Sequence, residues 1–434
     1  MMVGPLIMGL GTWALSAVPV PIEIHVSAGA ALLGSRDGSR EAPFATVFEA
    51  RDAMRVGLGA GAQRTVFIDG DHHLPEPLIL DRRDAGTAEA PIVWRSRSFA
   101  KPARLTGGKK LPVTAFTPAT VPSGAAGVVK AELYSAAIGL NSSIVPGMAS
   151  PYPFDDLELF YEGQPMTRAR SPNIAPDGTW MWSGYTNVTT VNDMSFEFLD
   201  SEKAELWAPA AAKGDLWLHG FFKFDWRDTF IRIASITKNS QGFNVTRDSA
   251  TKPQYPFTKG CRFYAVAALE LLDVPGEYHV DKKTGTLHFL PPTPLTPGSD
   301  LLVSVLNTVV QADTSHTKFQ GLTMSVSRDD IFSTTNRAAT TVGNNVTVED
   351  CVVSNAGGSC VHLQGSNNTA RNNTIFGCGT SGIAVISGNV KTLERGNSAA
   401  IGNEISQCSR IQRTCESPLL RDSIPACGTS AQQV

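Results

Sequence analysis

The sequence predicts an all-β protein, built as a parallel β-helix with an N-terminal capping helix and a β-rich insertion. The main observation is a repeat, because the segment that begins at Asn345 is matched 22 residues later by the segment that begins at Asn367. Copies of this length, with short strands, Asn turns and a Gly corner, are typical of stacked β-coils. The composition agrees, since 39 Gly and 27 Pro in a chain that is only 18% charged favour strands and turns over helical bundles.

We predict a signal peptide over residues 1–21. Residues 3–17 form a continuous apolar stretch of about signal-peptide length, which is short for a bilayer span. No Lys or Arg precedes this stretch, so a signal anchor or a plain N-terminal strand is the alternative. Secretion predicts an extracellular protein that is free of the membrane after signal removal. It also makes Asn187 and Asn244, both in Asn-x-Thr sequons, the expected glycosylation sites.

Residues 22–109 are predicted to form the cap and the first β-helix strands. Thr46 can cap a helix that has Glu49 three residues further on and an apolar face. Short β-type runs follow it, separated by turn signals, at residues 65–68, 77–80, 91–94 and 103–106. One helix ahead of such strands predicts that the helix covers the open end of the sheet structure.

Residues 110–317 are predicted to form an all-β insertion outside the coils. Pro-rich breaks recur in this stretch, and five of the seven Trp residues fall between 180 and 226. Residues 278–290 contain two alternating strands around a Lys-Thr-Gly turn, which predicts a hairpin.

Residues 318–420 are predicted to form the coils of the β-helix, and residues 421–434 a divergent tail. Leucine-rich repeats share the period, but their Leu-x-x-Leu-x-Leu frame is missing. Coils stack about 4.8 Å apart, so aligned inward residues form ladders. The aligned pairs include Val353 with Ile375 and Gly357 with Gly379.

Six of the seven Cys residues fall in the last 84 residues, and none lies in a CxxC pair, so a structural zinc is not indicated. The alignment pairs Cys378 with Cys408. We expect these two side chains to form an apolar interior rung, although the spacing of coils also allows a disulfide between them.

Several segments together resemble the pectin-lyase-like right-handed parallel β-helix proteins, and most closely the proteins similar to glycoside hydrolase family 141. That resemblance implies activity on plant or algal polysaccharides, of the fucosidase or xylanase kind. The polysaccharide or glycan is then the expected partner. The resemblance extends from about residue 35 to 420, and the segments that carry it are residues 84–95, 166–173, 218–228, 276–289 and 403–414.

The chain departs from similar proteins after Thr414. Those proteins continue with Tyr, a Pro and further coils, whereas here Cys415-Glu-Ser-Pro follows and the strand rhythm ends. The resemblance places the catalytic acids in the later coils. It therefore implies that this chain stops short of them, and we expect no hydrolysis of polysaccharides at an enzyme-like rate.

Glycoside hydrolysis needs two carboxyl groups that flank the scissile bond. Neighbouring acids such as Asp329 and Asp330 point to opposite faces of a strand, so they cannot share one cleft. A pair across coils, Asp330 with Asp350, is the weak candidate for catalysis, and solvated turn carboxylates are the alternative.

Four residues are candidates for substrate binding: Arg410, Arg413, His219 and Trp226. Arg offers a planar fork of donors that suits sugar hydroxyls and carboxylates, and Trp offers a face on which a sugar stacks. The alternative is structural, with the arginines joining coils and the aromatic residues packed inside the insertion. Arg168 and Arg170 are weaker candidates of the same kind.

The near-neutral balance of 37 basic and 40 acidic residues excludes a nucleic-acid partner that binds by charge alone. No cofactor is expected, and calcium is possible but not compelled, because the coils hold no dense acidic cluster. Two other functions stay open beside a hydrolase. They are a non-catalytic carbohydrate-binding or surface protein and a polysaccharide lyase.

Overall fold

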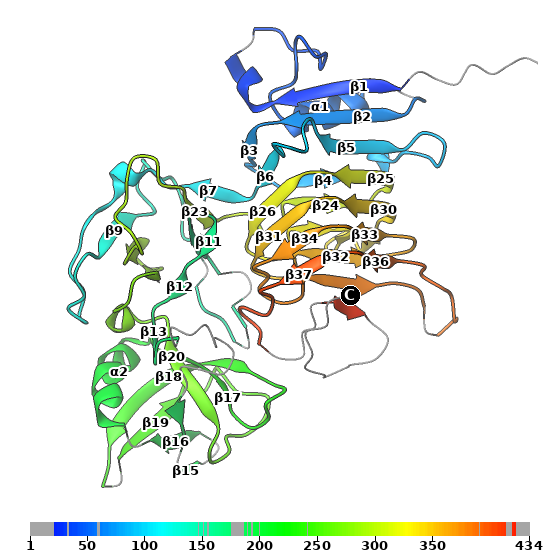
Figure 1. Cartoon of the computed structure of the whole chain (residues 1–434). Helices are drawn as coiled ribbons and strands as arrows, with labels where there is room; N and C mark the ends of the chain where they lie inside the picture. Colours follow the sequence, from blue (N-terminus) through cyan, green and yellow to red (C-terminus); the bar gives the residue numbers. More distant parts are fainter. Residues whose placement is uncertain are drawn as a thin grey trace, which may run out of the picture.

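The computed structural model describes residues 21–32, 34–58, 61–145, 147–150, 152–153, 156–174, 186–188, 190–191, 194–198, 200–240, 242–389, 391–413 and 419–421. Nearly all of the predicted signal peptide and residues 422–434 of the predicted tail lie outside them. The described chain is mostly β-structure. Figure 1 shows one group of strands stacked on the right and a second group beside it on the left. Among the described residues, no helix has the length and apolar character that crossing a membrane requires.

Three parallel sheets form the stacked group. The first two strands of the chain both belong to the first sheet, and from the second strand onward the chain places one strand in each sheet in turn, apart from the inserted segments. The first sheet contains β1 (Ile22–Ser27), β2 (Arg64–Asp69), β5 (Ile92–Ser96), β25 (Ser315–Gln320), β30 (Asn344–Glu349), β33 (Thr369–Arg371) and β36 (Ala399–Ile401). The second contains β3 (Asp71–His73), β6 (Arg104–Thr106), β26 (Thr323–Ser327), β31 (Val352–Ala356), β34 (Thr374–Phe376) and β37 (Glu404–Ser406). The third contains β4 (Leu78–Leu80), β24 (Val310–Ala312), β27 (Phe332–Ser333), β32 (Val361–Gln364), β35 (Ile383–Ile386) and β38 (Leu419–Arg421).

The 22-residue repeat sets the register of these sheets. Val353 pairs with Ile375 in neighbouring strands of the second sheet, and both side chains are fully buried, so this predicted rung is confirmed. The Asn turns have a backbone role. The side-chain oxygen of Asn373 accepts the N–H of Cys351 at 3.0 Å, and Asn368 does the same for Val346 at 2.9 Å. Each of these bonds spans one repeat.

Cys378 is buried in the core of the stack and Cys408 packs against the same core, in keeping with the predicted apolar rung, but the alternative of a disulfide between them is wrong. Cys378 forms a disulfide with Cys360, with the two Cα atoms 5.5 Å apart, and Cys408 is a free thiol. Cys360 precedes β32, and Cys378 follows β34 on the next circuit, so the bond joins two sheets at a corner of the stack. A ladder argument compares only residues of one sheet and therefore cannot find it.

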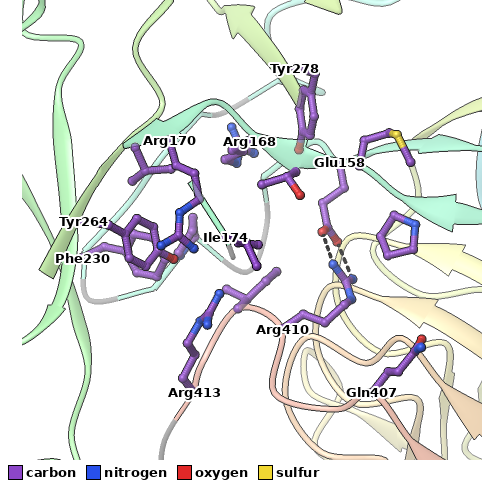
Figure 2. Close-up of a pocket in the computed structure, with 16 residues that line it drawn as sticks. Glu158, Arg168, Arg170, Ile174, Phe230, Tyr264, Tyr278, Gln407, Arg410 and Arg413 are labelled. Atoms are coloured by element: carbon purple, nitrogen blue, oxygen red, sulfur yellow. Dashed lines mark hydrogen bonds and ion pairs between the residues drawn. The ribbon is translucent and has the colours of Figure 1, made fainter. Parts of the chain in front are cut away.

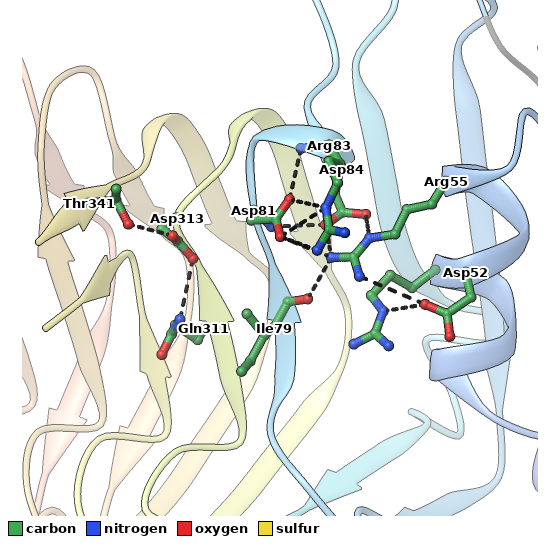
Figure 3. A network of polar contacts seen from close by, with 10 residues as sticks. Asp52, Arg55, Ile79, Asp81, Arg83, Asp84, Gln311, Asp313 and Thr341 are labelled. Carbon is green, nitrogen blue, oxygen red and sulfur yellow. Dashed lines mark hydrogen bonds and ion pairs between the residues drawn. The ribbon is translucent and has the colours of Figure 1, made fainter. Parts of the chain in front are cut away.

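Helix α1 (Val47–Arg55) packs on the N-terminal end of the stack, as predicted. Thr46 and Glu49 form the predicted capping box, and Val47, Ala50 and Met54 are buried. Arg55 at the end of the helix donates to both oxygens of the buried Asp84 carboxylate, at 2.8 and 2.6 Å. Figure 3 shows how Asp52, Asp81 and Arg83 extend this network of ion pairs.

The insertion leaves the stack at β7 (Gly108–Lys110) and returns at β23 (Leu301–Ser304), and these two strands pair with each other. The predicted boundary at residue 317 falls inside β25, since the circuit of β24 and β25 has no aligned copy of the repeat. The insertion is mostly antiparallel and contains β8 (Thr117–Pro118), β9 (Val129–Glu132), β10 (Leu159–Tyr161), β11 (Gln164–Pro165), β12 (Thr167–Arg168), β13 (Arg170–Ser171), β14 (Thr186–Asn187), β15 (Thr190–Val191), β16 (Ser195–Phe198), β17 (Trp217–Phe221), β18 (Thr229–Lys238), β19 (Phe243–Arg247), β20 (Arg262–Val266), β21 (Glu277–Asp281) and β22 (Thr286–Phe289). The predicted hairpin is the pair β21 and β22.

The insertion also contains the helix α2 (Ser201–Lys213), which the all-β prediction missed. Asp200 caps its first turn, and Gly214 ends it in a left-handed conformation. An Ala-rich face around the buried Trp207 packs against β18 and the core of the insertion. The small hairpin of β28 (Thr335–Asn336) and β29 (Thr341–Val342) extends from the stack between β27 and β30.

Candidate functional site

A cavity of about 330 Å³ lies where the insertion meets residues 407–413, which follow the last described strand of the second sheet. Pro153, residues 158–174 and strands β18, β20 and β21 supply the wall from the insertion. Figure 2 shows the side chains from both parts of the chain converging on this space. Among the described residues, four cations and one anion line it: Arg168, Arg170, Arg410, Arg413 and Glu158. The excess of guanidinium groups favours an anionic or hydroxyl-rich ligand.

Arg410 links the two walls of the cavity. Its guanidinium donates to both carboxylate oxygens of Glu158 at 2.7 and 3.1 Å (Figure 2). The same side chain donates to the backbone carbonyls of Gly377 and Ala356, at 2.8 and 2.9 Å. Both alternatives of the sequence analysis therefore apply to Arg410, because it joins strands of the stack and also faces the cavity.

Arg168 is held on the insertion side of the cavity. Its guanidinium lies 2.5 Å from the buried carboxylate of Asp156 and donates to the carbonyl of Leu157 at 2.8 Å. The guanidinium carbon also lies 5.5 Å from the centre of the Tyr278 ring. These contacts fix Arg168 in place as part of the wall.

Tyr264, His219 and Asp228 form a hydrogen-bonded row behind the cavity surface. The Tyr264 hydroxyl lies 2.6 Å from His219 Nδ1, and His219 Nε2 lies 2.7 Å from Asp228 Oδ2. Strand pairing creates the row, since His219 in β17 lies opposite Tyr264 in β20 and Phe230 in β18. The Phe230 ring stacks on the imidazole at 3.8 Å and fixes its plane. Tyr264 itself lines the cavity.

Asp228 orients this row. Its Oδ2 also accepts the backbone N–H of Arg413 at 2.8 Å, and its side chain is fully buried. A carboxylate only accepts hydrogen bonds, so the His219 nitrogen that faces it, Nε2, carries a proton. The other nitrogen, Nδ1, then shares one proton with the Tyr264 hydroxyl, and His219 is positively charged when the phenol is ionised.

Two guanidinium groups lie against Tyr264. Arg170 stacks on the ring with its guanidinium carbon 3.5 Å from the ring centre, and that of Arg413 lies 5.7 Å away. Burial raises the pKa of Tyr264, but the positive charges of His219, Arg413 and Arg170 and the hydrogen bond from His219 outweigh burial and lower this pKa to about 7. The phenol is thus poised to exchange a proton near neutral pH.

The structure brings three of the four predicted binding residues together. Arg410 and Arg413 line the cavity, and His219 lies directly behind Tyr264. Trp226 lies elsewhere, 42% exposed, where its ring stacks on Phe224 at 5.0 Å. Sugar stacking on the exposed face of this ring stays a prediction, at a place separate from the cavity.

The predicted pair of acids is not brought together. Asp330 lies between the second and third sheets, where it is buried against His362 and accepts the N–H of Ser359. Asp350 is exposed in the turn between the first and second sheets, with a φ of 53°. The two carboxylates belong to different corners of the stack, so they cannot flank one glycosidic bond.

Sequence reasoning missed Glu158, Tyr264 and the part played by Asp228. Glu158 had one signal, because it interrupts an apolar run between Leu157 and Leu159. No signal in the sequence pointed to Tyr264, since its hydrogen-bonded row with His219 and Asp228 forms only through strand pairing. Among the described residues, no group of three or more His, Cys, Asp or Glu side chains is arranged to hold a metal ion.

The two predicted glycosylation sites lie on strands of the insertion. Asn244 in β19 is half-buried, and its amide donates to Thr246 Oγ1 at 3.2 Å. Asn187 belongs to β14, and its side chain lies outside the described parts of the chain. Glycosylation stays a prediction at both.

No family model and no curated protein matches this chain. One similar solved structure, titled "Glycoside hydrolase", covers 92% of this chain and 75% of its own at 15% identity, with a TM-score of 0.66. A second, titled "The complex structure of XylC with xylose", covers 90% of this chain and 54% of its own at 11% identity, with a TM-score of 0.39. The first comparison shows that the chain shares its overall fold with a structure of that title.

Proposed function

We propose that this protein is a secreted, carbohydrate-active parallel β-helix protein that holds a saccharide in the cavity around Arg413 and Tyr264. One observation carries the proposal: the insertion and the parallel sheets meet at a cavity lined by four arginines, one glutamate and aromatic rings. Sugars are bound by planar donors that reach their hydroxyls and by aromatic faces that cover their C–H groups. The similarity to a structure titled "Glycoside hydrolase" supports the same class of ligand.

The β-helix architecture is part of the proposal. Support comes from the order of the strands, because successive circuits add one strand to each of three parallel sheets. Hydrogen bonds one repeat apart, from Asn368 and Asn373, support the same stacking. A pectin-lyase-like solenoid of the kind similar to glycoside hydrolase family 141 accounts for both.

Hydrolysis by two carboxyl groups finds no support at this cavity. Glu158 is the one acidic side chain in its described lining, and Arg410 holds both of its oxygens. We therefore propose saccharide binding as the basic function of this cavity.

Extracellular location is proposed on two features. The apolar N-terminal stretch suits a signal peptide, and the disulfide between Cys360 and Cys378 suits an oxidising compartment. Expression in a secreting eukaryotic host tests this proposal. We expect loss of about 17 to 21 N-terminal residues and glycan on Asn187 or Asn244. An unprocessed and unglycosylated product would overturn it.

Depletion of soluble polysaccharides from solution by the immobilised protein tests the binding proposal. The panel contains xylan, a fucose-containing polysaccharide, polygalacturonate and alginate. We expect at least one to be retained, and Arg413→Ala to weaken retention by more than tenfold, because the variant keeps the backbone N–H that binds Asp228 but loses the guanidinium. The matched control is Arg371→Ala, an exposed arginine of β33. Equal retention by both variants would contradict the assignment of this cavity.

A further inference from the structure

The row of Tyr264, His219 and Asp228 has the connectivity of an activated nucleophile or base. A buried carboxylate holds one imidazole nitrogen at 2.7 Å, and the other nitrogen lies 2.6 Å from an ionisable hydroxyl. In such a row the histidine takes the proton of the hydroxyl, and the carboxylate stabilises the imidazolium that forms. The proposed binding function gives this row no task, although its outer member lines the cavity.

Among the described residues, the charged or titratable groups found to face Tyr264 come from three elements. His219 comes from β17, Arg170 from β13 and Arg413 from the segment after β37, and Asp228 reaches the phenol only through His219. All three stabilise a phenolate. Arg170 and Arg413 also lie on the cavity side, where Figure 2 shows their guanidinium groups beside the Tyr264 ring. A ligand that reaches Tyr264 therefore meets positive charge at the same point.

We propose that Tyr264 is a catalytic general base that acts on a sugar bearing a carboxylate, which Arg170 and Arg413 bind, and that the reaction is β-elimination. This inference rests on the proposed function, since it assigns the substrate class and the reaction to the same cavity. The chemical groups that this reaction requires are present at the cavity. Elimination needs one base and a cation that neutralises the carboxylate, and it needs no second carboxylic acid.

The step balances without an oxidant or reductant. The Tyr264 proton passes first to His219 Nδ1, which leaves a phenolate. The phenolate oxygen removes the proton from the carbon that bears the carboxylate, and the electron pair of that C–H bond forms a C=C bond to the next ring carbon. The C–O bond of the glycosidic link on that carbon breaks, and its oxygen takes the proton back from Tyr264. One product carries an unsaturated uronate, and the other carries a new hydroxyl.

A nucleophilic role for Tyr264 fits the cavity less well. Attack at the anomeric carbon needs an acid to protonate the leaving oxygen. In the described lining, the acidic side chain is Glu158, which Arg410 holds in an ion pair. Elimination is the reaction for which the described residues supply every proton transfer.

The test uses the full chain with polygalacturonate, alginate and hyaluronan as carboxylate-bearing probes and with xylan as a neutral probe. Unsaturated uronate is followed by its ultraviolet absorbance, and binding by polysaccharide depletion. Wild type should form unsaturated product from at least one acidic probe. Tyr264→Phe should lower that rate by about 10²–10⁴, while its retention of the same probe stays within about twofold. Tyr255→Phe, which removes a phenol hydroxyl from a partly exposed tyrosine beside Trp226, should keep the full rate.

A second measurement does not depend on turnover. The tyrosinate difference spectrum between wild type and Tyr264→Phe should show one phenol that titrates near neutral pH, and the pH dependence of the rate should follow it. Retention of acidic probes without unsaturated product would overturn the base assignment and leave the binding proposal intact. Saturated reducing ends that disappear in Tyr264→Phe would overturn the elimination, and preference for xylan would overturn the acidic substrate. Failure to retain any polysaccharide would overturn the proposed function itself.

Discussion

Removal of the Arg410 guanidinium is expected to destabilise the junction between the insertion and the parallel sheets. Arg410 donates to both oxygens of Glu158, whose side chain is 9% exposed, at 2.7 and 3.1 Å. In Arg410→Ala this carboxylate stays buried without its cation, and breaking a buried pair in this way costs about 3–5 kcal/mol. The carbonyls of Gly377 and Ala356 also lose a donor. We expect a total loss at the upper end of that range.

Urea unfolding followed by Trp fluorescence measures the loss, and hydrogen exchange shows where it acts. Protection should fall in β10 and in residues 407–413 before it falls elsewhere. Arg395→Ala, which removes an exposed arginine of the stack, is the matched control and should change little. The double variant Glu158→Leu with Arg410→Met should recover most of the stability, because replacing both ions leaves no buried charge. A loss below about 1 kcal/mol in Arg410→Ala would refute the claim that this pair is desolvated.

Three further predictions concern other parts of the chain. Arg55→Ala should lower the free energy of unfolding by about 3 kcal/mol, because it leaves the Asp84 carboxylate buried without its cation. Thermal unfolding measures this loss. Arg83→Ala, at the exposed edge of the same network, is the control and should leave the unfolding midpoint unchanged. Gly379→Ala should cost about 1–3 kcal/mol in urea unfolding, since a Cβ there would overlap the backbone carbonyl of the preceding coil, whereas Gly298→Ala meets open space and should cost little. Because the pKa of Tyr264 is about 7 in the folded chain and about 10 when unfolded, wild type should gain stability over Tyr264→Phe as pH rises from about 7 to 10, and this gain should be absent below pH 7. A difference that does not change with pH would contradict the lowered pKa.

The parts of the fold that repeat were predictable from the sequence. The alignment over 22 residues placed Val353 and Ile375 in one rung, and the two residues pair in neighbouring parallel strands. The capping helix was predictable because Thr46 and Glu49 act within one turn. The disulfide of Cys360 was not predictable, since its partner lies on another sheet of the next circuit. Local signals fix local structure, whereas the corner contacts depend on how the three sheets meet.

The candidate site likewise has a part that was predictable from the sequence and a part that was not. Arg410, Arg413 and His219 were candidates because their residue types suit sugars, and the structure brings them to one region. Tyr264 and Asp228 stand 45 and 9 residues from His219 along the chain, so no spacing rule connects the three. The antiparallel register of β17 with β18 and β20 brings them into contact. A hydrogen-bonded row whose members lie on different strands cannot be predicted until the register of those strands is known.

Arg410 and Arg413 are three residues apart, and the structure gives them different and connected tasks. The side chain of Arg410 fastens the segment to Glu158, and the backbone N–H of Arg413 then reaches Asp228 while its guanidinium approaches Tyr264. Loosening the segment would therefore remove one donor from Asp228 and one positive charge from the phenol. Loss of the positive charge raises the pKa of Tyr264 toward its ordinary value near 10, because Arg413 is one of the cations that lower it. In folded Arg410→Ala the tyrosinate spectrum should thus titrate at higher pH than in wild type, and an unchanged midpoint would show that the pair stabilises the junction without setting the chemistry of the cavity.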